Sequence, residues 1–163
     1  MAEWLAERLV SYRRILVPVD GSATAAAGLR EAMRLAKDSK GARLQLVHVV
    51  DQHSAVMTSV ESAYYIDEMM DTLRKSGQRL LNRVVAQAGK AGVPAAGVLL
   101  ETLTGPAAEP IVGQAKKWGA DLIVLGTHGR RGVRRLVLGS DAEQVVRSSP
   151  VPVMLVRAAG RRA

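Results

Sequence analysis

The stretch LIVLGTHGRRGVRRLVLGS, residues 122 to 140, carries the residues best suited to binding a small anion. Its glycines and terminal hydroxyl follow the spacing G-x2-G-x9-G-S, formed by Gly126, Gly129, Gly139 and Ser140. Glycines adopt backbone torsions closed to other residues and let N–H groups approach an anion closely. The hydroxyl of Ser140 adds a donor, and Arg130 adds positive charge. The pattern therefore predicts a phosphate-binding loop.

Structural roles would also explain each of these residues taken alone. Gly126 and Gly129 are acceptable turn residues after a strand, Gly139 is acceptable before a helix, and the arginines could form a solvated face. The stretch is neither a Walker A loop (G-x-x-x-x-G-K-[ST]) nor a Rossmann loop (G-x-G-x-x-G). The phosphate interpretation therefore depends on the spacing as a whole.

Catalytic residues and protein-held metals are not predicted. The chain has no cysteine, which excludes thiol catalysis and thiolate metal ligands. His48, His53 and His128 share no ligand spacing, so no metal site of their own is expected. No nucleophile elbow surrounds Ser140, and no residue is identified that would position water for triphosphate hydrolysis. His48 is interpreted as a strand histidine with a local hydrogen bond.

The elements that must position this loop alternate along the chain. Nearly continuous apolar runs predict buried parallel strands at residues 13–20, 42–51, 95–103, 121–126 and 151–157. Helical spacing of apolar residues fills the intervals between them. Such alternation predicts a doubly wound α/β fold with a parallel sheet. Ligands of these sheets bind at the carboxyl ends of strands, where the strand order reverses.

The helix starts carry their own signals. Ser22 is the expected N-cap of the first helix, and the second is expected over 67–89. Pro106 suits a first helical position, although Pro110 would delay that helix. Ser140 is the expected N-cap of the last helix and has Glu143 at the spacing of a capping box.

Composition predicts one soluble domain with a basic end. The chain has 163 residues and no apolar run near the roughly 20 that a membrane helix needs. We expect a domain over 13–157, an extension at 1–12 and a basic tail at 158–163. The first segment does not resemble a secretory signal, so the expected location is the cytoplasm. Most of the net charge of +8 comes from eight arginines after residue 125. An anionic partner is favoured, but scarce aromatic residues disfavour nucleic acid.

Four further motifs accompany the loop in order: ILVPVDGS at 15–22, LVHVVD at 46–51, GPAAEPIV at 105–112 and SSPVPVMLV at 148–156. With the loop spacing, they resemble the universal stress protein family, in its ATP-binding branch, over about 13–157. The resemblance implies a five-stranded parallel sheet flanked by helices, of the adenine nucleotide alpha hydrolase-like kind. It also implies a homodimer with a nucleotide site in each subunit.

The same resemblance assigns the site residues. It places Asp20 and the backbone of Pro18 and Val19 beside the adenosine, and the backbone of Val49 against the adenine. The phosphates of ATP, AMP or ADP would be held by Gly126, Gly129, Gly139 and Ser140, with Arg130 beside them. Mg²⁺ would coordinate the phosphate oxygens. Chemically, Asp20 can accept from a ribose hydroxyl or from the adenine amino group, and apolar Val19 and Val49 can sandwich a base. Taken without the resemblance, Asp20 is also explained as a turn or capping acid before Ser22, and Val49 as a core residue.

The leading hypothesis is a dimeric, ATP-dependent stress or signalling regulator that hydrolyses ATP slowly or not at all, with an unidentified protein partner. An alternative is an enzyme, either a weak ATPase or an adenylyl-transfer relative. Another is a nucleotide-independent dimeric interaction module whose basic tail binds nucleic acid or acidic proteins. The last strand is apolar on both faces, so two such edges are expected to pair across a two-fold axis.

Overall fold

The computed structural model describes residues 11–51, 63–102, 105–127 and 138–158. Across these residues, strands and helices alternate as the sequence predicts. The strands are β1 (Arg14–Pro18), β2 (Arg43–Asp51), β3 (Ala95–Thr102), β4 (Leu122–Gly126) and β5 (Val153–Val156). The helices are α2 (Ala23–Asp38), α4 (Ala63–Lys90), α5 (Ala108–Trp118) and α6 (Ser140–Ser148).

The strands form one parallel sheet in the order β3-β2-β1-β4-β5. Ile15 of β1 is in register with Leu44 of β2 on one side and with Leu122 of β4 on the other. The chain therefore adds β2 and then β3 on one side of β1. It then crosses back and adds β4 and β5 on the other side. The prediction of a doubly wound, five-stranded α/β fold is confirmed, and the strand order reverses between β1 and β4.

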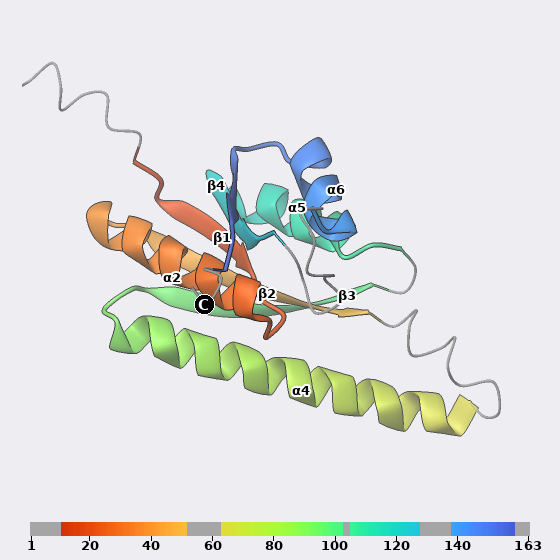
Figure 1. Cartoon of the computed structure of the whole chain (residues 1–163). Helices are drawn as coiled ribbons and strands as arrows, with labels where there is room; N and C mark the ends of the chain where they lie inside the picture. Colours follow the sequence, from red (N-terminus) through yellow and green to blue (C-terminus); the bar gives the residue numbers. More distant parts are fainter. Residues whose placement is uncertain (1–10, 52–62, 103–104, 128–137, 159–163) are drawn as a thin grey trace, which may run out of the picture.

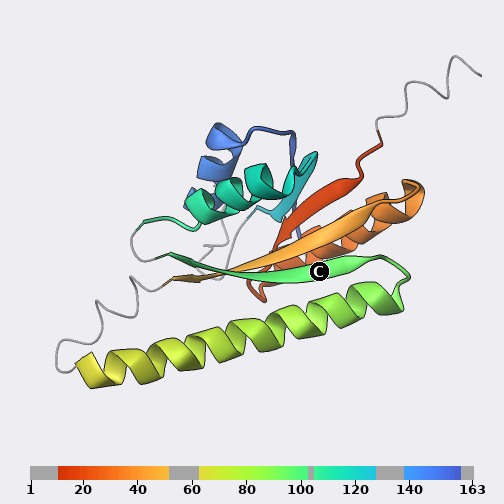
Figure 2. The ribbon, with the colours of Figure 1, turned by 180° about the vertical axis from the view of Figure 1, so that it is seen from behind.

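Helices cover both faces of this sheet. α2 and α4 lie on one face, and α5 and α6 lie on the other (Figure 1). Seen from behind, α4 runs along β2 and β3 for most of their length (Figure 2). Successive side chains of a strand point to opposite faces, so Ile15 and Val17 enter the cluster under α2 and α4, while Leu16 enters the cluster under α5 and α6. Burial on both faces explains why the strand sequences are continuously apolar.

The start of β1 is fixed by a side chain from far along the chain. The carboxylate of Asp121 accepts hydrogen bonds from the backbone N–H groups of Arg13, at 2.9 Å, and Arg14, at 3.0 Å. The backbone N–H of Asp121 in turn donates to the carbonyl of Arg14 at 2.9 Å. Asp121 therefore fixes the lateral alignment of β1 and β4 before their ladder begins.

The helix boundaries confirm one predicted cap and correct another. Ser22 is the N-cap of α2, and its hydroxyl accepts from the N–H of Ala25 at 3.1 Å. At α6, however, the N-cap is Gly139, Ser140 is the first helical residue, and no side chain caps the helix. The predicted capping box is wrong because, with Gly139 as the N-cap, the third helical residue is Ala142; Glu143 pairs with Arg147, one turn further along, at 2.8 Å. α5 begins at Ala108, later than the proline signal at 106, so Pro106 precedes the helix instead of taking its first position, and Pro110 lies in the first turn.

α4 is the longest helix of the described residues, with 28 residues. Leu80, Leu81, Val84 and Ala88 bury its inner face against the sheet. Arg74, on the same helix, makes two hydrogen bonds to the carboxylate of Glu101 on β3, at 2.8 and 3.0 Å. Even this helix is not apolar enough to cross a membrane, and the same is true of the other helices in the described ranges.

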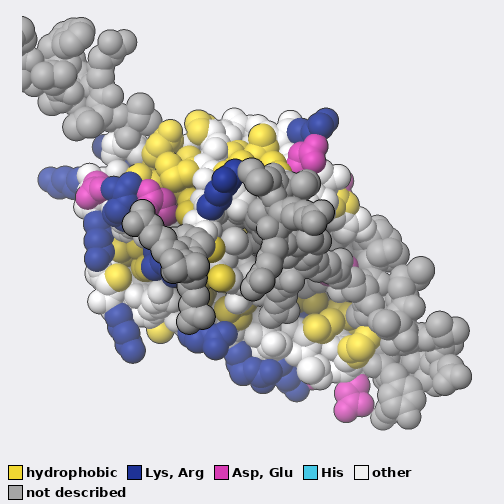
Figure 3. Space-filling view, in the orientation of Figure 1, with side chains coloured by type: hydrophobic (Ala, Val, Ile, Leu, Met, Phe, Trp, Pro, Cys, Tyr) yellow, Lys and Arg dark blue, Asp and Glu magenta, His cyan; other side chains and the backbone are white. Residues whose placement is uncertain are grey.

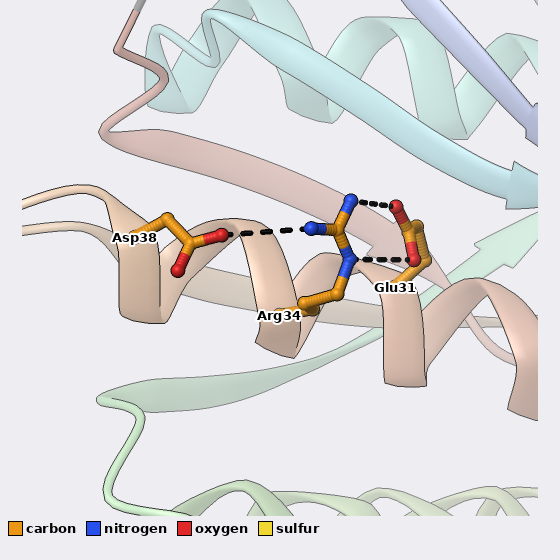
Figure 4. Close-up of polar contacts among 3 residues, drawn as sticks. All are labelled: Glu31, Arg34 and Asp38. Carbon is orange, nitrogen blue, oxygen red and sulfur yellow. Dashed lines mark hydrogen bonds and ion pairs between the residues drawn. The ribbon is translucent and has the colours of Figure 1, made fainter.

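An ion-paired row lies on the outer surface of α2. Arg34 donates two hydrogen bonds to Glu31, at 2.6 and 3.1 Å, and its guanidinium lies 3.6 Å from Asp38 (Figure 4). The hydrogen bonds from Arg34 lower the pKa of the Glu31 carboxyl below its usual value of 4.5. The side chains are 30% exposed at Glu31 and 62% exposed at Arg34, so solvent weakens the pair.

We predict a small, pH-dependent loss of stability for Glu31→Gln. A carboxyl whose pKa is lower in the folded state stabilises the fold above its unfolded pKa, and the effect disappears as the pH falls through the folded value. The variant should therefore unfold about 0.3–0.5 kcal/mol more easily at pH 7, and the difference should be smaller at pH 3, which is below the usual pKa of the carboxyl. Urea unfolding of both proteins at the two pH values measures this. A difference that stayed constant with pH would contradict the ionic origin of the effect.

Candidate functional site

The reversal of strand order places the carboxyl ends of β1 and β4 side by side. β1 ends at Pro18 and its chain turns into α2, whereas β4 ends at Gly126 and its chain continues toward α6. Because the crossovers leave in opposite directions, this is the position where open α/β sheets bind their ligands. The residues that follow the two strands are therefore the first candidates for a site.

Hydrogen bonds from β2 fix the chain just after β1. The N–H of Val19 donates to the carbonyl of Val47 at 2.8 Å, and Nδ1 of His48 donates to the carbonyl of Val19 at 2.7 Å. Oδ1 of Asp20 accepts from the N–H of Ser22 at 2.9 Å. The bond of His48 is thus not local, because it joins residues 29 apart. It connects β2 to the turn that carries Asp20.

The side chains of Val19 and Val49 differ in their surroundings. That of Val19 is 5% exposed and packs into the cluster under α2 and α4. Burial of this side chain leaves little of it for contact with a base, so the role of Val19 in sandwiching a base stays a prediction. Val49 is half-buried on β2 and packs against the cluster on the opposite face.

Gly126 has a packing role that the sequence does not reveal. A Cβ added at this residue would lie 2.5 Å from the carbonyl carbon of Thr24 and 2.8 Å from the backbone nitrogen of Ala25. Gly28, one turn further along α2, would place a Cβ 3.4 Å from the nitrogen of Gly126. The first turns of α2 therefore lie against the end of β4, backbone to backbone. In dinucleotide-binding folds, a glycine likewise allows a helix to pack closely against a strand.

The two described ends of the predicted phosphate loop meet at this point. The N–H of Gly139 donates to the carbonyl of Thr127 at 3.0 Å, which holds the start of α6 beside the end of β4. Ser140 is exposed in the first turn of α6, where N–H groups lack helical partners and favour an anion. The predicted residues Gly129 and Arg130, and also His128, lie outside the described residues.

Seven predicted site residues can therefore be located, and they form two neighbouring groups. Pro18, Val19, Asp20 and Val49 lie at the ends of β1 and β2; Gly126, Gly139 and Ser140 lie between β4 and α6. Residues that sequence reasoning missed are Thr24, Gly28 and Thr127, whose contacts are backbone contacts between distant segments. Within the described ranges, no three His, Asp or Glu side chains are grouped to hold a metal ion.

Comparison with known proteins identifies the relatives of this chain. A model of the universal stress protein family matches residues 11–157. Universal stress protein MJ0531 of Methanocaldococcus jannaschii is 34% identical over 146 residues, which cover 90% of this chain and 82% of that protein. The solved structure of protein MJ0577 superposes with a TM-score of 0.80 at 26% identity, covering 93% of this chain and 99% of that one.

A further solved structure carries a ligand. It is the universal stress protein of Archaeoglobus fulgidus in complex with dAMP, which matches with a TM-score of 0.59 at 26% identity. The match covers 90% of this chain and 99% of that protein. Both solved structures thus match this chain over nearly their whole length.

We predict that Gly126→Ala destabilises the fold through its contact with α2. The new methyl group would force α2 and β4 apart, at a cost of about 1–3 kcal/mol in the free energy of unfolding. Gly113→Ala is the matched control, because Gly113 lies inside α5 with no atom within 4 Å of the added Cβ. That variant should gain up to about 1 kcal/mol. Thermal and urea unfolding of both variants measure the difference. Equal stability of Gly126→Ala and the wild type would show that α2 is not held by this contact.

Proposed function

Since this chain belongs to the universal stress protein family, we propose that it binds an adenine nucleotide, foremost ATP, where β1 and β4 diverge. The observation that carries the proposal is the convergence of residues from three motifs separated in sequence, at 15–22, 46–51 and 122–140. Asp20 and Val49 lie at adjacent strand ends, and Gly126 and Gly139 are joined through Thr127. The dAMP complex of the Archaeoglobus fulgidus relative supports an adenine nucleotide as the class of ligand.

The adenosine would lie at the ends of β1 and β2. Asp20 would accept a hydrogen bond from a ribose hydroxyl, and the backbone of Pro18, Val19 and Val49 would surround the base. A carboxylate that already accepts from the N–H of Ser22 is held in orientation by that bond, so it can meet a ligand with little loss of side-chain freedom.

The phosphates would lie between β4 and α6. Gly126 and Gly139 would present backbone N–H groups, Ser140 its hydroxyl, and Gly129 and Arg130 would complete the loop. Mg²⁺ would bind through the phosphate oxygens, which it prefers to a cage made of protein groups alone. AMP or ADP would use the same adenosine contacts with fewer contacts to the loop.

The output of binding would be a regulatory state, with turnover slow or absent. This part of the proposal follows from a phosphate loop whose sequence nominates no group to position water. The rival is a weak ATPase. Phosphate release that scales with protein concentration, survives purification and is lost in Ser140→Ala would favour the rival.

A binding surface for polyanions is the other alternative. On the face in Figure 3, Lys and Arg side chains of the described residues are spread over several separate places, with Asp and Glu side chains beside some of them. A continuous nucleic-acid surface would instead place many cations along one path. Binding to nucleic acid that ignored ATP and fell steeply with salt would favour the alternative.

Dimerisation is proposed through β5, which lies at an edge of the sheet. Leu155 is 38% exposed there. The carbonyl of Pro152 accepts from Ile123 of β4, and that of Val156 accepts from Thr127, just after β4. By the alternation of a strand, the N–H groups of Val153 and Leu155 therefore point away from the sheet. Pairing of two such edges would satisfy these donors and cover the apolar side chains.

We predict that nucleotide-stripped protein binds ATP with Mg²⁺ at about one nucleotide per subunit. We also predict that two variants separate the contribution of the adenosine end from that of the phosphate end. Asp20→Asn keeps an oxygen for the N–H of Ser22 but removes the charge. It should weaken the binding of ATP and of adenosine by about 10- to 100-fold, the cost of losing a charged hydrogen bond. The affinity for tripolyphosphate should not change. Gly129→Val should weaken the binding of ATP and tripolyphosphate but leave the affinity for adenosine unchanged.

Calorimetric titration with the three ligands measures these effects. Equal losses for adenosine and tripolyphosphate in Asp20→Asn would argue against its assignment to the adenosine. Unchanged ATP affinity in Gly129→Val would remove the loop from the site. A wild type that binds no adenine nucleotide would refute the proposed function.

We predict that the protein is a dimer at micromolar concentration and that Leu155→Pro makes it a monomer. Proline removes an outward N–H while leaving the hydrogen bonds of β5 to β4 in place, and edge strands tolerate it in that orientation. Leu155→Thr, which keeps the N–H, is the control and should remain a dimer. Sedimentation velocity distinguishes the outcomes. A monomeric wild type would exclude pairing through β5.

A further inference from the structure

The carbonyl of Val19 leaves the regular ladder between β1 and β2. Pro18 is in register with Val47, and the N–H of Val19 extends the ladder by bonding to the carbonyl of Val47. In a parallel ladder, the next bond would run from the N–H of Val49 to the carbonyl of Val19. Within the described residues that backbone bond is not formed, and the imidazole of His48 donates to this carbonyl instead.

The position of Gly77 on α4 makes room for this imidazole. A Cβ at Gly77 would lie 2.6 Å from Cδ2 of His48 and 2.8 Å from Cδ1 of Leu99. The leucine methyl is at the end of a flexible side chain and can rotate away, but the ring is held by its bond to Val19. Glycine inside a helix costs about 1 kcal/mol relative to alanine, and unlike Gly89 on the same helix, Gly77 has a close contact that an added Cβ would violate.

Because the imidazole of His48 bonds to the carbonyl of Val19, the N–H of Val49 does not use that carbonyl as its acceptor. The N–H and C=O of a strand residue point to the same side, so the N–H of Val49, like the carbonyl of Val47, faces the side of β1. β1 has ended there, and the chain turns away through Asp20 into α2. A backbone donor is thus directed past the end of β1, toward the region proposed for the adenosine.

We propose that His48 is a positioning residue for adenine recognition. By taking the carbonyl of Val19, its ring leaves the N–H of Val49 for an acceptor nitrogen of the base, and it holds the segment that carries Asp20. Gly77 is required because it admits the ring. The inference rests on the proposed function, since it specifies how the adenosine end of that site is prepared.

The matched variants are His48→Asn and His48→Leu. The two side chains branch at the same carbon and have nearly the same shape, but only asparagine can place an N–H where Nδ1–H lies. His48→Leu should weaken ATP and adenosine by about tenfold, the effect of one hydrogen bond, while tripolyphosphate is bound as in the wild type. His48→Asn should restore most of the affinity.

A second measurement requires no ligand. In the nucleotide-free wild type, the amide of Val49 should exchange with solvent faster than that of Val47, whose backbone lies within the ladder. In His48→Leu, the freed carbonyl of Val19 is available to Val49, so exchange at Val49 should slow by about tenfold. Amide exchange followed by NMR gives both rates.

The helix side of the contact is tested by Gly77→Ala, with Gly89→Ala as its control on the same helix. An added Cβ at Gly89 meets no atom within 4 Å, so that variant should bind all three ligands as the wild type does. Gly77→Ala should displace the ring and lose adenosine affinity as His48→Leu does. In a His48→Ala background, Gly77→Ala should cause no further loss, because the ring is gone.

The outcomes separate this inference from the proposed function. Adenosine affinity that is equal in His48→Leu and the wild type would overturn the role of His48 while ATP binding stands. Exchange at Val49 as slow as at Val47 in the wild type would also overturn it, whether or not any variant folds. A wild type that binds neither ATP nor adenosine would instead refute the proposed function.

Discussion

The approach of two backbones, at the first turn of α2 and the last residue of β4, sets the geometry of the whole carboxyl edge. No Cβ fits between Gly126 and Thr24, and Gly28 keeps the next turn of α2 equally near. This contact holds the start of α2 beside the place where β1 and β4 diverge. The Asp20 turn and the Thr127–Gly139 bond therefore lie in one small region. A wider spacing between α2 and β4 would separate the adenosine and phosphate ends of the proposed site.

The fold was predictable because its signals are local. Continuous apolar runs marked the strands, and the hydroxyl of Ser22 marked the start of α2. The cap at Ser140 was predicted wrongly because Gly139 is held by Thr127, across a loop that local patterns do not describe. The partner of His48 and the tight packing of Gly126 were also out of reach, since both involve residues far apart in the sequence. The residues of the phosphate end were reached from their spacing and those of the adenosine end through resemblance, and the roles of both are still predictions.

The two ends of the proposed site would contact the ligand through different kinds of groups. At the adenosine end, backbone groups on strands would contact the base, and their positions are fixed by the ladder and by the ring of His48. At the phosphate end, glycines and a hydroxyl at a helix start would contact the ligand. Recognition through the backbone requires a fixed strand position but no particular side chain. The residue at a position such as Val49 can therefore vary while its N–H keeps its direction.

β1 is held by side chains at both of its ends, by Asp121 before it and by His48 after it. As a central strand it also needs β4 beside it, yet Arg13 and Asp121 are 108 residues apart. During synthesis, β1 leaves the ribosome first, and β2 and β3 can join it on one side as they follow. Its other side must wait until the carboxylate of Asp121 and the strand after it have emerged. β1 is made before the other four described strands but is among the last of them to be enclosed. The reversal of strand order that places two strand ends at the proposed site therefore also delays the completion of the sheet around β1.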